Sequence, residues 1–416
     1  MRILAITARH PPDHLGGYEL RCHGILQALI SRGHQVRVLT TRPCSEVNDS
    51  DDGVLRLLHL APSGSTVQRI AWDYLDLRHI RRTLRQWTPD VVGLFHTLQL
   101  TRSLFPFLAG RGLPLVYDEG GMGLVSAWRK HGEWFSLCQR GRGGIIKRAL
   151  RRAAVLSARG LSGNLLPTEW SWPTNMLIYF NSEYGLARHA EGGVPVATAR
   201  VIRSGIALDR FGFKPGRRAA DAVKLVLPGR IVPGKGIEEA IRATAILRWK
   251  TPQLRPRLQV VGPIQNLEYY DAVRQLVKGL LLEEDVAFTA MVPHDRMDSV
   301  YHDADFCLLL SQREAFSRIP LEAMACGSVL ITNASGGGRE IARPGENAIV
   351  VPGTAPERIA EEVIGLVQSE SDFLRIQQNA RRYVEENHDL ESYVDKVEAV
   401  FAEAAARGAG RSQLNA

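Results

Sequence analysis

The sequence predicts an α/β protein built on parallel sheets in two consecutive domains. Short apolar runs bounded by polar residues alternate with longer helical patterns, and this alternation is typical of βαβ units. The chain of 416 residues has room for two or three domains of about 150 residues each. Hydrophobic residues at 45% and charged residues at 23% are ordinary for a soluble globular protein with two cores.

The first half begins with a strand at residues 2–7 and a loop that contains glycines. Gly16 and Gly17 precede a helical pattern, and glycine lets a backbone approach a ligand closely, although a plain strand-to-helix turn is the alternative. A long helix is expected over 65–87. Further strands are expected at 35–41, 54–60, 89–96, 113–117, 177–182 and 199–204.

Two polar residues follow neighbouring strands of this half. His96 ends the strand at 89–96, and Asp118 follows the strand at 113–117. Because the carboxyl ends of parallel strands share one edge, both are expected to face the same cleft. Either could assist proton transfer from a substrate hydroxyl, whereas a packed, purely structural histidine is the more frequent case.

The stretch 121–175 is rich in arginine, lysine and tryptophan. Residues 145–156 fit a basic amphipathic helix, which either lies on an anionic membrane face or forms a solvated face over a core. Aromatic rings can also stack on flat or apolar ligands, and arginines pair with acidic groups, so this stretch is a candidate for ligand recognition. The net charge of +8 does not by itself predict nucleic-acid binding. The residues concerned are Trp128, Arg129, Lys130, Trp134, Arg140, Arg142, Lys147, Arg148, Arg151, Arg152, Arg159, Trp170 and Trp172.

The second half contains the most informative stretch, residues 301–332. The apolar run 306–310 predicts a buried strand, Pro320 suits the first position of a helix, and Gly327 suits its end. A second buried strand follows at 329–332. The loop 311–319 therefore lies at the carboxyl end of a parallel strand, where such sheets bind ligands, next to a helix start that suits a phosphate.

Charged residues surround that loop. Glu314 lies inside it, and Glu322 lies in the first helical turn, where the simpler roles are a solvated charge and a partner of the helix dipole. Arg230 and Lys235 lie in the earlier stretch GRIVPGKG, which is not a Walker P-loop. An arginine can bind phosphate oxygens bidentately, and a lysine supplies a mobile point charge.

On these residues the sequence resembles the retaining glycosyltransferases of the GT-B fold that carry a Glu-x7-Glu motif (family 4, glycosyl transferases group 1). The chain departs from that family at Ala290 and Ser317, which replace glycines, and at Gly120-Gly121, where many members carry His-Asp. The family text S-x-x-E-G-F-G-x-x-x-L-E-A-M-A-x-G is matched by Ser311, Glu314, Phe316, Leu321, Glu322, Ala323, Met324, Ala325 and Gly327.

The resemblance implies two Rossmann-like domains that face each other across a cleft, with a C-terminal helix that crosses back to the first. Residues 1–212 would form the acceptor-side domain, which includes the basic stretch, and 213–385 the nucleotide-sugar domain. Residues 386–406 would form the crossover helix, and 407–416 a disordered tail.

The resemblance also implies a hexosyltransferase that moves a sugar from a nucleotide-diphosphate donor to a glycan, lipid-linked or small-molecule acceptor, with retention and without metal or cofactor. Fixed cations would stabilise the departing diphosphate. Asp303-Ala304-Asp305 spells the metal-binding DxD, but Asp305 opens a buried strand and is interpreted as structural. The predicted catalytic residues are Glu314, Arg230, Lys235, Asp118 and His96. The predicted donor-binding residues are Gly16, Gly17, Arg230, Lys235, Met291, Val292, Glu314, Phe316, Ser317, Arg318, Ile319 and Glu322.

The absence of certain sequence motifs bears on the cellular compartment of the protein and on the alternative functions. Scattered cysteines without a CxxC pair and an N-terminus without a signal peptide indicate the cytoplasm, with peripheral contact at the inner membrane face as a further expectation. An inactive GT-B partner subunit, a GT-B epimerase and a phosphorylase remain alternatives. A nicotinamide oxidoreductase would need GxGxxG after the first strand, where the sequence reads PPDHLGG.

Overall fold

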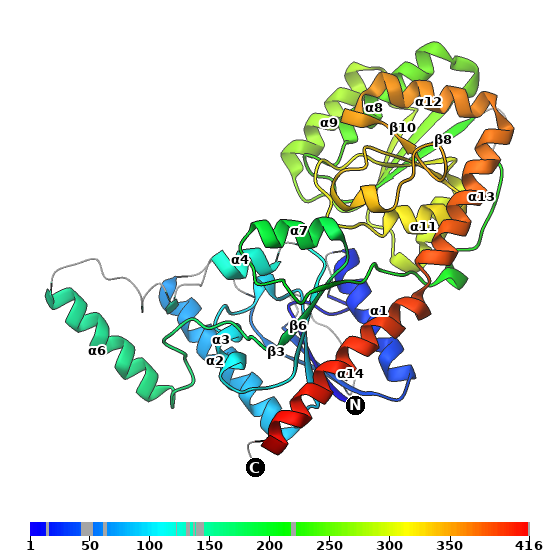
Figure 1. Ribbon diagram of the computed structural model, residues 1–416. Helices are drawn as coiled ribbons and strands as arrows, with labels where there is room; N and C mark the ends of the chain where they lie inside the picture. The colour runs from blue at the N-terminus through cyan, green and yellow to red at the C-terminus, as the bar shows by residue number, and fades with distance from the viewer. Residues whose placement is uncertain are drawn as a thin grey trace. The chain divides into compact units, whose positions relative to one another are not determined.

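The computed structural model describes all residues except 14–15, 43–52, 61–64, 122, 130–133, 136–137, 139–144, 218–221 and 415–416. The chain divides into two compact units, each with its own parallel sheet (Figure 1). The first unit comprises Met1–Asn181, Gly185–Ile202 and Val394–Ala416, and the second comprises Ser182–Tyr184 and Arg203–Tyr393.

The first unit is built on a seven-stranded sheet in the order β3-β2-β1-β4-β5-β6-β7. Ile3 of β1 pairs with Val36 on one side and with Val91 on the other, so β1 is an internal strand of the sheet. Its strands are β1 Arg2–Thr7, β2 Gln35–Thr41, β3 Val54–Leu58, β4 Val91–Phe95, β5 Leu115–Glu119, β6 Met176–Phe180 and β7 Arg200–Val201.

Two helices of the first unit, at 104–109 and 123–129, were not predicted from the sequence, and the prediction for the C-terminus needs a correction. Residues 407–414, expected to be disordered, continue the last helix instead. That helix packs on the first unit, because Glu398 pairs with Arg32 and His34 and the ring of Phe401 stacks on Phe95. The helices are α1 Gly17–Ser31, α2 Thr66–Gln86, α3 Leu104–Ala109, α4 Gly123–Arg129, α6 Ile145–Leu161, α7 Glu183–Glu191 and α14 Leu390–Leu414.

The second unit is built on a six-stranded sheet in the order β10-β9-β8-β11-β12-β13. Leu225 of β8 pairs with Leu258 of β9 and with Phe306 of β11, so β8 is central. The strands are β8 Val223–Pro228, β9 Pro256–Val261, β10 Val286–Thr289, β11 Phe306–Leu309, β12 Val329–Thr332 and β13 Ile349–Val350.

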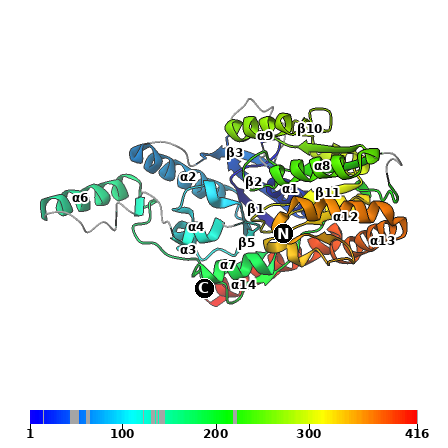
Figure 2. The same cartoon turned by 90° about the horizontal axis from the view of Figure 1, so that it is seen from above.

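Helices cover both faces of this second sheet (Figure 2). One apolar cluster joins the sheet to α8, α9 and α12, the other joins it to α10 and α11, and α13 contributes to both. The sequence analysis assigned no helix to α9 or α10. The helices are α8 Ile237–Lys250, α9 Leu267–Gly279, α10 Met297–Asp303, α11 Ile319–Cys326, α12 Pro356–Gln368 and α13 Glu370–Asn387.

In both sheets the strand order reverses beside the first strand. The reversal falls between β1 and β4 in the first unit and between β8 and β11 in the second. Open α/β sheets bind ligands beyond the carboxyl ends of the strands at such a point. The loops that follow β8 and β11, and those that follow β1 and β4, are therefore the places to look for a site. No described helix is long and apolar enough to span a membrane.

Candidate active site

In the second unit, glycines bring the loop after β8 against the end of β11. Gly234 and Gly236 have φ of 81° and 79°, a left-handed conformation that glycine adopts readily. A Cβ added to Gly236 would lie 2.2 Å from the Cβ of Leu310. Only a glycine therefore lets Lys235 approach the loop that follows β11.

The predicted lysine and the first predicted carboxylate meet at this point. Lys235 Nζ lies 3.1 Å from Glu314 Oε2 and 3.3 Å from Ser311 Oγ. Both charged side chains keep about a fifth of their surface exposed, at 22% and 20%, so a ligand can reach them. Arg230 follows β8 as well, but its guanidinium donates to Gln265 Oε1 from the loop after β9, at 3.2 Å.

The loop that follows β12 fixes the position of Glu314. Gly337 N donates to the Glu314 carbonyl at 2.9 Å. A Cβ on Gly336 or Gly337 would lie 2.1 Å or 1.9 Å from the carbonyl oxygens of Glu314 and Ala315, so the two loops touch backbone to backbone. Asn333 Nδ2 donates to the Ser311 carbonyl at 3.0 Å from the same side.

The second carboxylate is buried and surrounded by donors. Glu322 Oε1 accepts from His294 Nε2 at 3.0 Å and pairs with Arg318 at 3.3 Å, and Oε2 accepts from the Tyr301 hydroxyl at 3.0 Å. Burial alone would raise the pKa of Glu322, but Arg318, His294 and Tyr301 hold that pKa below its ordinary value. The carboxylate is therefore ionised and acts only as a hydrogen-bond acceptor.

His294 and Tyr301 belong to this cluster, although the sequence analysis missed both. His294 lies just beyond Met291 and Val292, the predicted nucleobase-binding stretch, and Tyr301 lies on α10. Neither residue belongs to a motif, so only the fold shows that they meet Glu322. Met291 is 57% exposed and Val292 is half-buried.

At the start of α11, a nearby side chain accepts a hydrogen bond from one of the free backbone N–H groups. Ser317 is buried, and its hydroxyl accepts from Ile319 N at 3.3 Å. One of the amides expected to face a phosphate is thereby occupied. Phe316 packs into the core of the unit, and the side chain of Arg318 is 16% exposed beside Glu322.

Asp305 has a structural role. The side chain is buried, and Oδ2 accepts from Lys224 N at 2.9 Å, which ties the start of β11 to β8. Asp303 pairs with the Lys224 ammonium at 2.6 Å near the surface. Among the residues that the structure describes, no three His, Cys, Asp or Glu side chains gather as metal ligands would.

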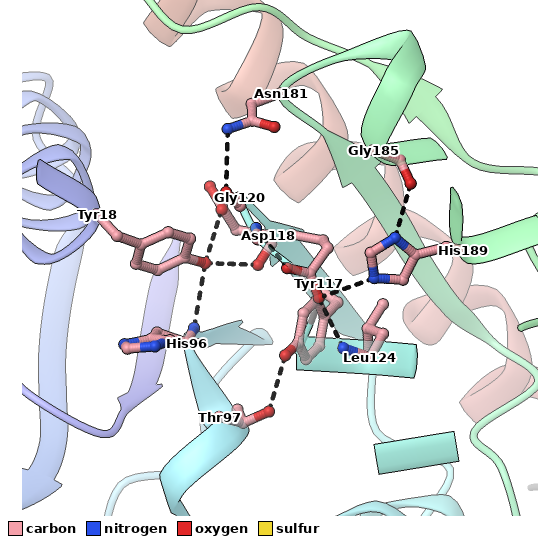
Figure 3. A network of polar contacts seen from close by, with 12 residues as sticks. Tyr18, His96, Thr97, Tyr117, Asp118, Gly120, Leu124, Asn181, Gly185 and His189 are labelled. Atoms are coloured by element: carbon pink, nitrogen blue, oxygen red, sulfur yellow. Dashed lines mark hydrogen bonds and ion pairs between the residues drawn. The ribbon is translucent and has the colours of Figure 1, made fainter. Parts of the chain in front are cut away.

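In the first unit, the first turn of α1 organises the ends of β4 and β5 (Figure 3). The Tyr18 hydroxyl accepts from His96 N at 3.1 Å and donates to Asp118, whose Oδ1 lies 2.8 Å away. Arg21 forms an ion pair with Asp118, and both side chains are almost fully buried. Asp118 lies inside β5, which runs two residues further than predicted, so it is enclosed rather than presented to a ligand.

His96 is more accessible than Asp118. Its side chain is 25% exposed, and its backbone has a φ of 45°, which is uncommon for a residue with a side chain. Nδ1 lies 3.1 Å from Glu19 Oε1. Glu19 Oε2 accepts from Gly16 N, also at 3.1 Å. Burial would raise the pKa of Glu19, but its contacts with His96 and the Gly16 amide lower that pKa overall.

The glycines of this unit differ in their surroundings. A Cβ on Gly16 or Gly17 would meet nothing within 4 Å, so the loop before α1 borders open space. A Cβ on Gly120 would lie 2.3 Å from the Tyr18 ring and 2.6 Å from the Arg21 guanidinium. Tyr18 and Arg21 thus fill the space that a side chain at position 120 would need.

The adjacent Glu119 is a buried structural carboxylate. It accepts from Gly121 N and Leu124 N, both at 2.7 Å, and lies 3.4 Å from His189 Nε2. Burial would raise the pKa of Glu119, but His189 and these amides lower it. This carboxylate therefore fixes the start of α4 and is not available to a ligand.

The tryptophans of the basic stretch belong to the core of the first unit. Trp134 is buried and donates to the Pro167 carbonyl at 2.6 Å, so the prediction that its ring stacks on a ligand is wrong for this residue. Trp172 stacks on Phe105, and Trp128 meets Trp172 edge-on. Of the predicted cations, Lys130, Arg140 and Arg142 lie outside the described residues, as do the side chains of Lys147, Arg148 and Arg151.

Solved structures with this architecture define the fold as GT-B. The Anabaena protein HepE in complex with UDP-glucose superposes with a TM-score of 0.69 at 18% identity, covering 97% of this chain and 100% of that one. Sucrose-phosphate synthase from Thermosynechococcus elongatus superposes with a TM-score of 0.70 at 19% identity, covering 98% and 99%.

Two family models match the two halves of the sequence. The glycosyl transferase 4-like domain matches residues 16–163, and glycosyl transferases group 1 matches residues 212–383. The chain belongs to the group 1 glycosyltransferases, as the Glu-x7-Glu motif predicted.

Curated relatives carry different activities. D-inositol 3-phosphate glycosyltransferase from Geodermatophilus obscurus is 33% identical over 226 residues, which cover 51% of this chain and 49% of the relative. The chain thus spans about half the length of that relative. Glycogen synthase from Mycobacterium tuberculosis is 25% identical over 435 residues, covering 99% and 97%.

Proposed function

We propose that the protein is a retaining glycosyltransferase that moves a sugar from a nucleoside-diphosphate donor to a hydroxyl or amine of a glycan, lipid-linked or small-molecule acceptor. The observation that carries the proposal is the Lys235–Glu314 pair, held beside β8 and β11 where the strand order reverses. Family membership supports the reaction class. The free cysteines among the described residues, three of them buried, favour the reducing cytoplasm.

The charge on the leaving group is the main problem that such a site must solve. As the glycosidic bond to the diphosphate breaks, negative charge grows on the phosphate oxygens. Lys235 is placed to hold a phosphate oxygen while it remains close to Glu314, and Arg230 can exchange its weak contact with Gln265 for a second phosphate oxygen. Glu314 then accepts from hydroxyls of the donor sugar and stabilises its positive carbon.

Retention follows from attack on the face that the leaving group vacates. The acceptor oxygen bonds to the anomeric carbon as the carbon–oxygen bond to phosphate breaks, and the hydroxyl proton passes to the departing phosphate oxygen. His96, oriented by Glu19, is the better candidate to contact the acceptor, because Asp118 is enclosed by Tyr18 and Arg21. We assign Asp118 a structural role within that network.

A panel of nucleotide sugars tests the proposal. We expect at least one UDP-, GDP- or ADP-sugar to raise the melting temperature and to be slowly hydrolysed, with the released sugar keeping its anomeric configuration by proton NMR. Binding without transfer or hydrolysis would favour an inactive partner subunit, and conversion to an epimeric donor would favour an epimerase. Absence of binding by every donor would contradict the proposed function.

Replacing His294 tests the position of Glu322. Glu322 is expected to accept from the ribose hydroxyls, and His294 Nε2 fixes its Oε1. In His294→Leu, we expect the dissociation constant of the preferred nucleoside diphosphate to rise by about fivefold, since one hydrogen bond to a charged group is lost. His294→Gln keeps an N–H donor and should recover most of the affinity in calorimetry. Equal affinity in both variants would mean that His294 does not position Glu322.

A further inference from the structure

Helix α6, Ile145–Leu161, differs from the other helices of the first unit in charge and in exposure. Its sequence IIKRALRRAAVLSARGL contains five lysines and arginines and no acidic residue. With 17 residues it is about 25 Å long at 1.5 Å per residue. Both views show α6 standing apart from the other helices of that unit (Figures 1 and 2).

The helix contacts the rest of the unit along one side and exposes an apolar stripe on another. Val155 and Ala158 are half-buried and pack against the core cluster of the first unit. The exposed stripe comprises Ala149, Ala153, Leu156 and Gly160, which recur at the spacing of one helix face. Leu156, the largest of them, is 61% exposed.

Charged and apolar residues are separated around the axis of α6. Arg152 and Arg159 are exposed along one edge of the stripe. As a sequence pattern the helix is amphipathic, with apolar residues recurring at helical spacing among five cations. A helix with this separation and only basic charge is typical of elements that lie in a membrane interface.

We propose that α6 docks the protein on an anionic lipid bilayer, with the stripe around Leu156 in the acyl boundary and the arginines at the lipid phosphates. We choose an anionic bilayer because it matches both the positive charge of α6 and its exposed apolar stripe. A neutral partner matches only the stripe, and a small acidic ligand matches only the charge. Cationic residues near an anionic bilayer contribute about 1 kcal/mol each, and the burial of one leucine contributes about 1.5–3 kcal/mol. The proposal does not depend on the transferase reaction.

Vesicle co-sedimentation of the full chain tests this proposal. We expect binding to vesicles of phosphatidylglycerol and phosphatidylcholine, weaker binding at high salt, and little binding to phosphatidylcholine alone. Leu156→Glu should lower the partition coefficient at least about tenfold, because a buried leucine is lost and a carboxylate is added. The double variant Arg152→Gln, Arg159→Gln should lower it by about fivefold for each arginine.

The matched control is Leu267→Glu, the same substitution at a helical leucine of the second unit that is 72% exposed. This variant should bind vesicles like the wild type, and circular dichroism should show all variants folded. Wild-type binding that survives Leu156→Glu would overturn the proposal, as would no binding to anionic vesicles. A monomer–dimer equilibrium abolished by Leu156→Glu, without vesicle binding, would instead make the stripe an interface between copies. Salt-sensitive capture of duplex DNA in place of vesicles would assign the arginines to nucleic acid.

Discussion

Replacing Lys235 with alanine is expected to lower sugar transfer about 100- to 1000-fold, the loss seen when one preorganised stabilising group is removed from a charged transition state. Lys235 follows β8, and its ammonium lies 3.1 Å from Glu314 Oε2. In the proposed mechanism, the departing diphosphate then loses a stabilising cation, and Glu314 loses the ammonium that lies beside it. Initial rates at saturating donor measure the effect on kcat.

The control for this variant is Lys224→Ala. Lys224 lies at the opposite end of the same strand, where its ammonium pairs with Asp303, so it shares the residue type and the unit but not the site. We expect transfer by Lys224→Ala to match the wild type. Normal turnover by a folded Lys235→Ala variant would show that this lysine does not stabilise the leaving group.

Replacing Arg21 with leucine is expected to lower the free energy of unfolding of the first unit by about 3–5 kcal/mol. The reason is that the buried carboxylate of Asp118 loses the buried guanidinium that pairs with it. Asp118 and Arg21 have side chains that are 1% and 5% exposed. Urea unfolding followed by tryptophan fluorescence measures the loss, since every tryptophan except Trp249 lies in the first unit.

Two further variants separate the lost charge pair from lost packing. Arg188→Leu removes an arginine from an exposed pair with Glu191 on α7, and such pairs contribute about 0–1 kcal/mol. Asp118→Asn combined with Arg21→Leu removes both charges and should recover part of the lost stability. If Arg21→Leu unfolds at the same urea concentration as Arg188→Leu, the buried ion pair does not hold β5 in place.

Local signals in the sequence were enough to predict the strands and the helix that surround the loop containing Glu314. An apolar run, Pro320 and Gly327 together predicted β11, α11 and β12, and Gly327 ends α11 with a φ of 84° as expected. These signals act within a few residues, so one sequence contains them completely. The strand-end rule predicted that the loop 311–319 borders a ligand site. The resemblance to the Glu-x7-Glu family put Lys235 in the same site as Glu314, and the two side chains lie 3.1 Å apart.

Partners that are distant in sequence could not be predicted. Arg21 meets Asp118 across 97 positions, and His294 meets Glu322 across 28, and neither pair has a spacing that any helix or strand would impose. The same holds for Gly120, where the reason for a glycine is the ring of Tyr18 from another element. The prediction of a disordered tail failed for another reason. The glycines at 408 and 410 disfavour helix locally, but a Cβ on Gly408 would lie 2.1 Å from Pro114 Cγ, so the glycine lets α14 pack closely against the first unit.

The backbone contact between the loops after β11 and β12 has a consequence for engineering. Gly337 leaves no room for a side chain against Ala315. The two loops, residues 311–319 and 333–338, therefore fit each other closely and form one structural unit. A chimaera meant to change the preferred sugar should therefore exchange both segments together. Grafting the first alone would place a foreign loop on a surface shaped for its original partner.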